Sequence, residues 1–492
     1  MPDPPFGDHN ASNMHLPSFP GAREARAFVG RKCRGSSAKV RLDLRNVKTS
    51  IRAPSYDLVM PPRRDDDRAL RLIRPLPDFL YTEAAGGIVL VAAIAATLVW
   101  ANAWPASYHD IWTTTFTIGF PDHHLSLTLR DWVNDGLMTV FFFVVGLEIK
   151  RELVEGELRQ PRKAALPVVA AVGGMIVPAL IYTAFNAGTA GSRGWGIPMA
   201  TDIAIAVGIL SLLGTRVPSS LKLFLLALAI VDDIGAIIVI ALFYSRGITW
   251  ESFAGAICVV LLMLAARALG VRNIVAFTVM GIALWILVYD SGVHATLVGV
   301  ALGLLTPTRP FRAHDMLEAD KLTDVSTVEG AYETVVLARE SVSVVEWLEY
   351  HLHPLSSYVI VPLFALANAG IVVTSGTVDR ASSSSVTHGV VVGLVVGKLV
   401  GISAFVWLAT KLRIGALPDG TSWSQLVGVA ALGGIGFTVS LFVSTLAFPG
   451  RIALQADAKL GILVASAVAA VLGGLILLAT TRNRARASGP GT

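Results

Sequence analysis

The sequence predicts an all-α polytopic membrane protein with about twelve transmembrane helices and a small β-hairpin outside the bilayer. First, 53% of its 492 residues are hydrophobic and only 15% are charged, against about 25% charged in soluble domains. Second, the apolar residues form unbroken runs of about 20, the length that crosses a hydrocarbon core of roughly 30 Å. Third, most charges fall between these runs, in loops and tails. These features exclude a soluble enzyme, a secreted scaffold and a nucleic-acid binder.

The first 75 residues differ from the rest of the chain. Fifteen Lys and Arg and nine Asp and Glu precede position 81, with Pro, Gly and Ser between them. No apolar core follows a basic start, so we expect no secretory signal. The acids argue against a transit peptide and favour a disordered cytoplasmic extension. An alternative hypothesis is that translation begins at Met60, in which case residues 1–59 are rarely made. Residues 76–482 would form the membrane domain and 483–492 a cytoplasmic tail.

Twelve apolar segments are expected to cross the membrane. They are 82–103, 136–154, 164–186, 195–214, 219–244, 252–269, 273–289, 291–305, 355–374, 387–409, 424–447 and 458–480. Between the first two, Phe116 to Phe120 and Leu125 to Leu129 alternate apolar and polar residues around a Pro-Asp turn, which predicts the β-hairpin. The loop at 306–354 is long and charged, and its second half is predicted to be a surface helix.

Orientation follows from the basic residues of the loops. Eighteen Lys and Arg lie on one side of the predicted spans and six on the other, with the tail before residue 81 left out. Basic loops stay in the cytoplasm. Both termini are therefore predicted to be cytoplasmic, in agreement with an even number of spans. The two cysteines, Cys33 and Cys258, have no spacing typical of a disulfide framework or a metal site.

Four ionisable residues lie deep inside predicted spans: Asp202, Asp232, Asp233 and Lys398. Each opposes insertion by roughly 2.5–3.5 kcal/mol, or about 10–14 kcal/mol together. A buried Asp–Lys pair that only holds helices together would leave surplus carboxylates. Adjacent helical residues point about 100° apart, so one of the paired aspartates can bind a cation while its neighbour meets Lys398. Groups in such a low-dielectric site can change protonation near physiological pH, which is what exchange of a proton for a cation requires.

Two of the predicted spans contain helix-breaking residues near these charges. The fourth opens with glycines and Pro198 and continues to Thr201 and Asp202, and the eleventh contains the run from Gly433 to Thr438. Glycine and proline weaken a helix locally, and unwound backbone at membrane depth needs protein or water beside it. Close helix packing is the alternative explanation for the glycines. Spans 3–5 and 10–12 would each place a discontinuous helix second of three, as inverted repeats do.

A charged cluster ends the second span. Glu148, Arg151 and Glu152 share one helix face because they are spaced i, i+3 and i+4. A solvated helix end with exposed ion pairs explains this pattern equally well. The alternative is a cytoplasmic entrance that responds to pH, since histidine titrates in the physiological range. Its candidate partners from the long loop are Glu349, His351 and His353.

Six collinear segments resemble the NhaA family of bacterial sodium/proton antiporters. The resemblance extends from Tyr81 to Arg482, more than 80% of the chain. The segments are NDGLMTVFFFVVGLEIKREL, ATDIAIAVGIL, LALAIVDDIGAIIVIALFY, WLEYHLHPLSSYVIVPLFALANAGI, GKLVGI and GGIGFTVSLF.

The resemblance implies a role for each matching residue. Asp233 would be the main cation ligand and proton carrier, and Asp232 would pair with Lys398 when no cation is bound. Thr201 would be a further ligand of the transported Na⁺. The crossing of two broken helices would be lined by Asp202, Gly434, Gly436 and Thr438, and the pH response would come from Glu148, Arg151, Glu152, Glu349 and His353.

The resemblance also implies how the protein works in the cell. It would exchange Na⁺ or Li⁺ for H⁺ electrogenically, in the bacterial cytoplasmic membrane, for sodium and pH homeostasis. It would form a homodimer through the hairpin near 115–130 and use no nucleotide or prosthetic group. His351 and the long N-terminal extension depart from the family pattern, which leaves the pH set-point open.

Membrane enzymes, channels and inactive relatives are the alternatives to an antiporter. Intramembrane aspartyl proteases need Tyr-Asp and Gly-x-Gly-Asp, and none of Asp202, Asp232 and Asp233 has either context. Lipid transferases hold Mg²⁺ through several carboxylates, but no third acid follows Asp232 and Asp233 closely. A passive cation channel would not be expected to carry a central lysine. An inactive or sensory relative would have the same sequence features and stays open.

Overall fold

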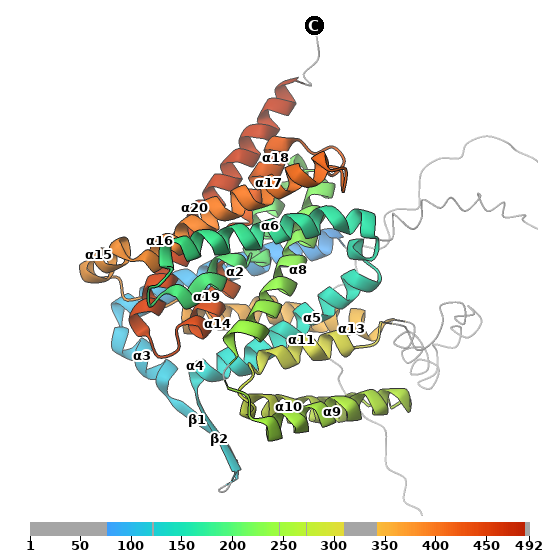
Figure 1. Ribbon diagram of the computed structural model, residues 1–492, viewed down its shortest axis with the longest axis vertical. Helices are drawn as coiled ribbons and strands as arrows, with labels where there is room; N and C mark the ends of the chain where they lie inside the picture. Colours follow the sequence, from blue (N-terminus) through green and yellow to red (C-terminus); the bar gives the residue numbers. More distant parts are fainter. Residues whose placement is uncertain (1–75, 121–122, 246, 272, 309–341, 488–492) are drawn as a thin grey trace, which may run out of the picture. The chain divides into compact units, whose positions relative to one another are not determined.

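The computed structural model describes residues 76–120, 123–245, 247–271, 273–308 and 342–487, all within one compact unit, Asp66–Thr492. The predicted extension at 1–75, most of the predicted long loop, the Pro121-Asp122 turn and the end of the tail lie outside the described residues. In the described part of the chain, helices dominate and a single two-stranded sheet projects beside them (Figure 1). This confirms the prediction of a helical polytopic protein with a small hairpin.

The described α-helices cover most of the predicted apolar segments, several of them in two pieces, and three short helices lie outside those segments. In chain order they are α2 (Leu76–Ala103), α3 (Pro105–Thr113), α4 (Leu129–Asp131), α5 (Met138–Val154), α6 (Pro161–Asn186), α7 (Ile203–Leu212), α8 (Ser219–Val239), α9 (Trp250–Ala268), α10 (Ile274–Asp290), α11 (Thr296–Leu305), α13 (Val344–Leu355), α14 (Val361–Asn368), α15 (Ser375–Ser383), α16 (Ser385–Val392), α17 (Lys398–Lys411), α18 (Trp423–Leu432), α19 (Phe437–Ala447) and α20 (Ile452–Ala487).

Short 3₁₀ and π segments interrupt or extend these helices. The 3₁₀ segments are η2 (Glu157–Arg159), η3 (Ser192–Met199) and η4 (Gly214–Arg216), and the π segments are η1 (Trp132–Leu137), η5 (Ile240–Tyr244), η8 (Ser356–Ile360) and η9 (Gly393–Gly397). Segment η9 links α16 to α17 and ends directly before Lys398.

Seven described helices, counted through such interruptions, are long and apolar enough to cross a membrane, and an eighth is formed if α18 and α19 count as one span with a bend of 44°. Helix α11 differs from its predicted span at 291–305, because its ten residues reach only about 15 Å. A turn containing Gly292 at φ 80° precedes it and takes up the first part of that segment.

The hairpin consists of β1 (Thr115–Phe120) and β2 (His123–Thr128), which pair antiparallel with Ile118 opposite Leu125. The indole nitrogen of Trp132 donates to the Phe116 carbonyl at 2.9 Å, which anchors the hairpin to η1. The side chains of Phe116 and Ile118 are more than half exposed. The hairpin therefore leaves part of its apolar surface exposed.

Glycines allow α6 and α17 to approach each other closely. A Cβ added to Gly173 would lie 2.5 Å from the carbonyl oxygen of Gly401, and one added to Gly401 would lie 2.3 Å from that of Gly173. Neither position accepts a side chain without moving a helix backbone. This contact fixes the start of α17, and with it Lys398, beside α6.

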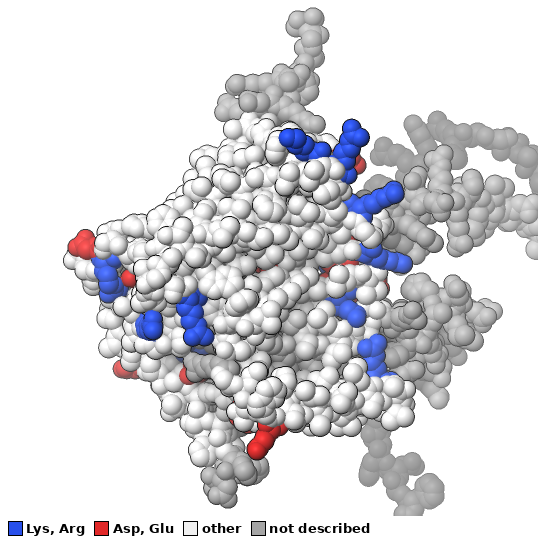
Figure 2. Space-filling view, in the orientation of Figure 1, with Lys and Arg blue, Asp and Glu red and all other residues white. Residues whose placement is uncertain are grey.

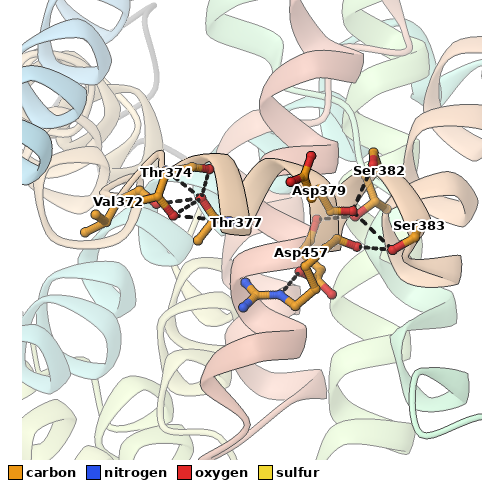
Figure 3. A network of polar contacts seen from close by, with 9 residues as sticks. Val372, Thr374, Thr377, Asp379, Ser382, Ser383 and Asp457 are labelled. Atoms are coloured by element: carbon orange, nitrogen blue, oxygen red, sulfur yellow. Dashed lines mark hydrogen bonds and ion pairs between the residues drawn. The ribbon is translucent and has the colours of Figure 1, made fainter.

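The short helix α15 is held by its own caps and by α20 (Figure 3). Thr374 and Thr377 form a capping box at its start, and the hydroxyls of Ser382 and Ser383 donate to the Asp379 carbonyl. From the same helix, Arg380 pairs with Asp457 of α20 at 3.0 Å.

Candidate functional site

Two interrupted helices meet at the predicted helix crossing. Segment η3 ends at Met199, extended residues follow, and α7 starts at Ile203. Similarly, α18 ends at Leu432 and α19 starts at Phe437. The amide of Asp202 donates to the carbonyl of Ile435 at 2.6 Å, so the two interruptions are joined backbone to backbone. Pro198 and the glycines from 433 to 436 disfavour continuous helices here.

The carboxylate of Asp202 accepts hydrogen bonds from backbone amides at the starts of two helices. Its Oδ1 accepts from the amide of Ile205 at 3.2 Å, and its Oδ2 accepts from the amide of Thr438 at 3.0 Å. The side chain is buried. Helix N-termini leave unpaired amides that carry partial positive charge. Asp202 therefore holds the starts of α7 and α19 together with one negative charge.

The crossing is close enough to exclude side chains at two of its glycines. A Cβ on Gly434 would lie 2.4 Å from the carbonyl oxygen of Leu394. One on Gly436 would lie 2.4 Å from the hydroxyl of Ser440 and 3.1 Å from the Ala200 carbonyl. Gly434 therefore lies where η9 and α20 touch the break between α18 and α19.

Next to the crossing, Lys398 forms an ion pair with Asp232 of α8, and both side chains are fully buried. Thr201 lies between them. Its hydroxyl is 2.7 Å from Asp232 Oδ2 and 2.9 Å from the Gly433 carbonyl, and it accepts from Lys398 Nζ at 3.1 Å. The hydroxyl has one proton and can donate to one of its two acceptors at a time. The helix ends, α8 and α17 thus share one polar network.

Asp233 lies in the same region but outside this ion pair. Its side chain is only 5% exposed, and its Oδ1 has no hydrogen-bond partner among the described residues. The charges of Asp232, Glu148 and Asp202 repel it electrostatically and that of Lys398 attracts it. Asp232 Oδ1 is likewise buried and unpartnered within the described part of the chain. Two carboxylate oxygens are therefore available to a hard cation, which prefers oxygen ligands.

A permanently bound metal ion would need several ligating side chains close together. In the described ranges, no group of three or more His, Cys, Asp or Glu side chains is arranged to hold a metal ion. The two aspartates and Thr201 instead form a small set of buried oxygens.

A second polar cluster joins α2, α5 and α13. Arg151 of α5 forms an ion pair with Glu349 of α13, and its Nη2 lies 3.9 Å from Glu152. His353 Nε2 lies 2.6 Å from Glu83 of α2 and 3.7 Å from Glu148. The sequence-predicted residues Glu148, Arg151, Glu152, Glu349 and His353 are thus brought together.

Burial and neighbouring charges shift the pKa values of Glu349 and His353, the two cluster residues on α13. Burial raises the pKa of Glu349, while the charges of Arg151 and His353 oppose that change. Burial alone lowers the pKa of His353, but the hydrogen bond to Glu83 and the charges of Glu148, Glu83 and Glu349 raise it to about 9. This cluster therefore couples protonation to contacts among three helices.

The structure changes two expectations about this cluster. The predicted surface helix before residue 355 is α13, and it continues through η8 into α14, so Glu349 and His353 are buried against α5. His351 lies outside the cluster, because its ring is exposed and contacts the Trp347 carbonyl at 2.8 Å. Sequence reasoning missed Glu83. The available signal was that Glu83 is the only ionisable residue in the first apolar segment.

Several known proteins have sequences similar to that of this chain. The family model described as Na⁺/H⁺ antiporter 1 matches residues 77–477. The Na⁺/H⁺ antiporter NhaA of Rhodopirellula baltica is 46% identical over 83% of this chain and 94% of its own length. The corresponding proteins of Oleidesulfovibrio alaskensis and Rhizobium meliloti are 44% and 43% identical, over 84% and 86% of this chain and 96% and 98% of their own lengths. The chain belongs to the Na⁺/H⁺ antiporter 1 family, and with these relatives to its NhaA members.

Proposed function

We propose that this multi-pass membrane protein is a transporter, not an enzyme, that exports Na⁺ or Li⁺ in electrogenic exchange for external protons and is regulated by pH. The relatives are named for Na⁺/H⁺ antiport. One observation carries the proposal for this chain. Asp233 is a buried carboxylate with an unpartnered oxygen, placed next to the buried Asp232–Lys398 pair.

Competition for these carboxylates explains the exchange. A cation that binds Asp233, the free oxygen of Asp232 and Thr201 weakens the attraction of Asp232 for Lys398. The buried ammonium then loses the charge that stabilises it, so it and Asp233 release protons. When the cation leaves, protons return and the ion pair re-forms. More protons than cations move in a cycle, so the exchange carries net charge and responds to the membrane potential.

Regulation by pH is assigned to the cluster of Glu148, Arg151, Glu152, Glu349 and His353, with Glu83 as an added member. The charge of Glu148 also acts on Asp233. A change of protonation in the cluster therefore alters the electrostatic potential at the cation site. The cluster needs no bound ligand for this effect.

The proposed arrangement in the membrane keeps the predicted number of spans, with α11 shorter than its predicted span. Residues 76–482 form a twelve-span domain in the bacterial cytoplasmic membrane, with inverted repeats at spans 3–5 and 10–12 and both termini in the cytoplasm. The two interrupted helices of the crossing would be the second members of these repeats. The exposed apolar residues of the hairpin support a homodimer through residues near 115–130. No nucleotide or prosthetic group is required.

Everted membrane vesicles test this function. Added Na⁺ or Li⁺ should dissipate a preformed pH gradient when the wild-type protein is present, and K⁺ should not. The Asp233→Asn variant should abolish the response across the range from about pH 6 to about pH 9, while Asp379→Asn, at an exposed aspartate, should keep it. Undiminished exchange by Asp233→Asn would remove Asp233 from the cation site.

A further inference from the structure

A basic pocket lies at the ends of three apolar helices, apart from both clusters described above. It is a cavity of about 900 Å³ between the start of α6, the end of α17 and the start of α18. Arg162, Lys411 and Arg413 line it, together with Trp407 and Trp423, and no acidic residue is among its lining residues. It therefore carries a formal charge of +3 that nothing in its own wall neutralises.

The pocket lies where a bilayer would change from hydrocarbon to headgroups. Trp407 and Trp423 are 52% and 42% exposed, and exposed tryptophans gather at membrane interfaces. Lys411 Nζ lies 4.8 Å from the centre of the Trp407 ring. Figure 2 shows Lys and Arg gathered along the edge of the molecule at right, the end of the bundle where α5 ends and α6 begins in Figure 1. An apolar stripe leads along η9 and α17 to the pocket, through the exposed Val396, Val400 and Leu408.

The backbone at the pocket has an unusual conformation at Arg413. Its φ is 58°, and it is the sole non-glycine residue with positive φ in the described part of the chain. Asparagine and glycine are the residues that usually end a helix in this conformation. An arginine in this conformation carries backbone strain. Arg413 is also one of the three basic residues that line the cavity.

We propose that this pocket binds the headgroup phosphate of an anionic phospholipid, whose acyl chains lie along the exposed stripe of α17. Basic pockets between transmembrane helices attract anionic headgroups. The cavity is large for a single inorganic anion, and its connection to the apolar stripe favours a lipid. A zwitterionic lipid carries no net charge to match the three cations. The site does not depend on the proposed ion exchange, since none of its residues belongs to the cation site.

Lipid titration of the full-length protein, purified in detergent, tests the proposal. Bound phosphatidylglycerol is measured by native mass spectrometry, with phosphatidylcholine and inorganic phosphate as comparison arms. The pocket variant combines Arg162→Gln, Lys411→Gln and Arg413→Asn, because asparagine tolerates the positive φ. A matched control combines Lys150→Gln, Arg159→Gln and Arg216→Gln, three basic residues outside the pocket.

The expected effect follows from the three charges. Each basic residue near an anionic surface contributes about fivefold in affinity, so the pocket variant should bind phosphatidylglycerol about 100-fold more weakly. The control should bind it like the wild type. Each single pocket substitution should weaken binding about fivefold, which keeps the test valid if the triple variant is unstable.

Three results would overturn the proposal. The pocket variant could retain the affinity of the control, which would place the lipid elsewhere. Phosphatidylcholine could bind as tightly as phosphatidylglycerol, which would indicate apolar contact alone. Inorganic phosphate could displace phosphatidylglycerol at equal concentration, which would make the pocket a site for free anions.

Discussion

Removal of Lys398 should destabilise the protein strongly. In the Lys398→Ala variant the Asp232 carboxylate keeps its buried position but loses its ion-pair partner, and only the Thr201 hydroxyl remains close to its Oδ2. Both side chains are 0% exposed, so water does not replace the lost ammonium. Breaking a buried pair by removing one partner costs about 3–5 kcal/mol. We expect a loss of that size in the free energy of unfolding.

A double-mutant cycle separates the charge from the cavity that truncation leaves. Asp232→Asn alone strands the ammonium, and we expect it to cost about as much as Lys398→Ala. The double variant strands no charge, so it should be more stable than the sum of the single effects. The coupling free energy should be about 3 kcal/mol, at the upper end for contacting residues.

Unfolding of the purified protein in detergent, followed by intrinsic tryptophan fluorescence, measures these differences. Lys163→Ala is the matched control, because Lys163 is 57% exposed and its pair with Glu157 is 3.6 Å long; exposed pairs contribute about 0–1 kcal/mol. If the Lys398 and Asp232 effects are additive, or if Lys398→Ala is as stable as the control, the ion pair does not hold α8 and α17 together.

Three further predictions concern the helix crossing and the histidine cluster. Asp202→Ala should lower the unfolding free energy by about 2–6 kcal/mol, because two buried amides lose their acceptor at about 1–3 kcal/mol each; unchanged stability in the same fluorescence assay would refute the capping role. Gly434→Ala should cost about 1–3 kcal/mol and reduce transport in vesicles, since its Cβ would lie 2.4 Å from the Leu394 carbonyl. The pKa of His353, raised from 6.5 to about 9, means that folding favours the charged ring by about 3 kcal/mol. That stability is fully present below about pH 6.5 and is lost as the pH rises through about 9. The wild type should therefore exceed His353→Gln in stability by most at about pH 6 and by least above about pH 9; a gap that grows with pH would contradict the Glu83 pairing.

Most of the fold could be predicted from local patterns. Hydropathy placed the apolar helices, because transfer of a segment of about 20 residues into lipid depends on its composition and not on its neighbours. The alternation from Phe116 to Leu129 predicted the strands. Local pattern failed for α11, where a turn shortens the helix, and for α13, where burial depends on which helix packs against it.

The residue pattern predicted which charged residues form the site, but not which of them contact one another. Three aspartates and a lysine inside apolar segments are conspicuous in any reading of the sequence, because each opposes membrane insertion. Which aspartate meets Lys398 depends on helix rotation, which the residue pattern alone left open. The family resemblance implied Asp232, and the structure pairs Asp232 with Lys398 while Asp233 keeps an unpartnered oxygen. Glu83 joined the cluster only through the packing of α2 against its neighbours.

The sequence by itself determined that this chain is a polytopic membrane protein and which charges it buries, since both follow from the cost of placing each residue in hydrocarbon. Only the tertiary structure decided how those charges act together. The amide of Thr438 reaches the Asp202 carboxylate across 236 residues of chain, and Lys398 reaches Asp232 across 166. Contacts at such separations depend on how helices pack, where glycines such as Gly173 and Gly401 set the distance between backbones. No local pattern contains that distance, which is why the low charge content revealed a membrane protein but the pairing of its buried charges required the fold.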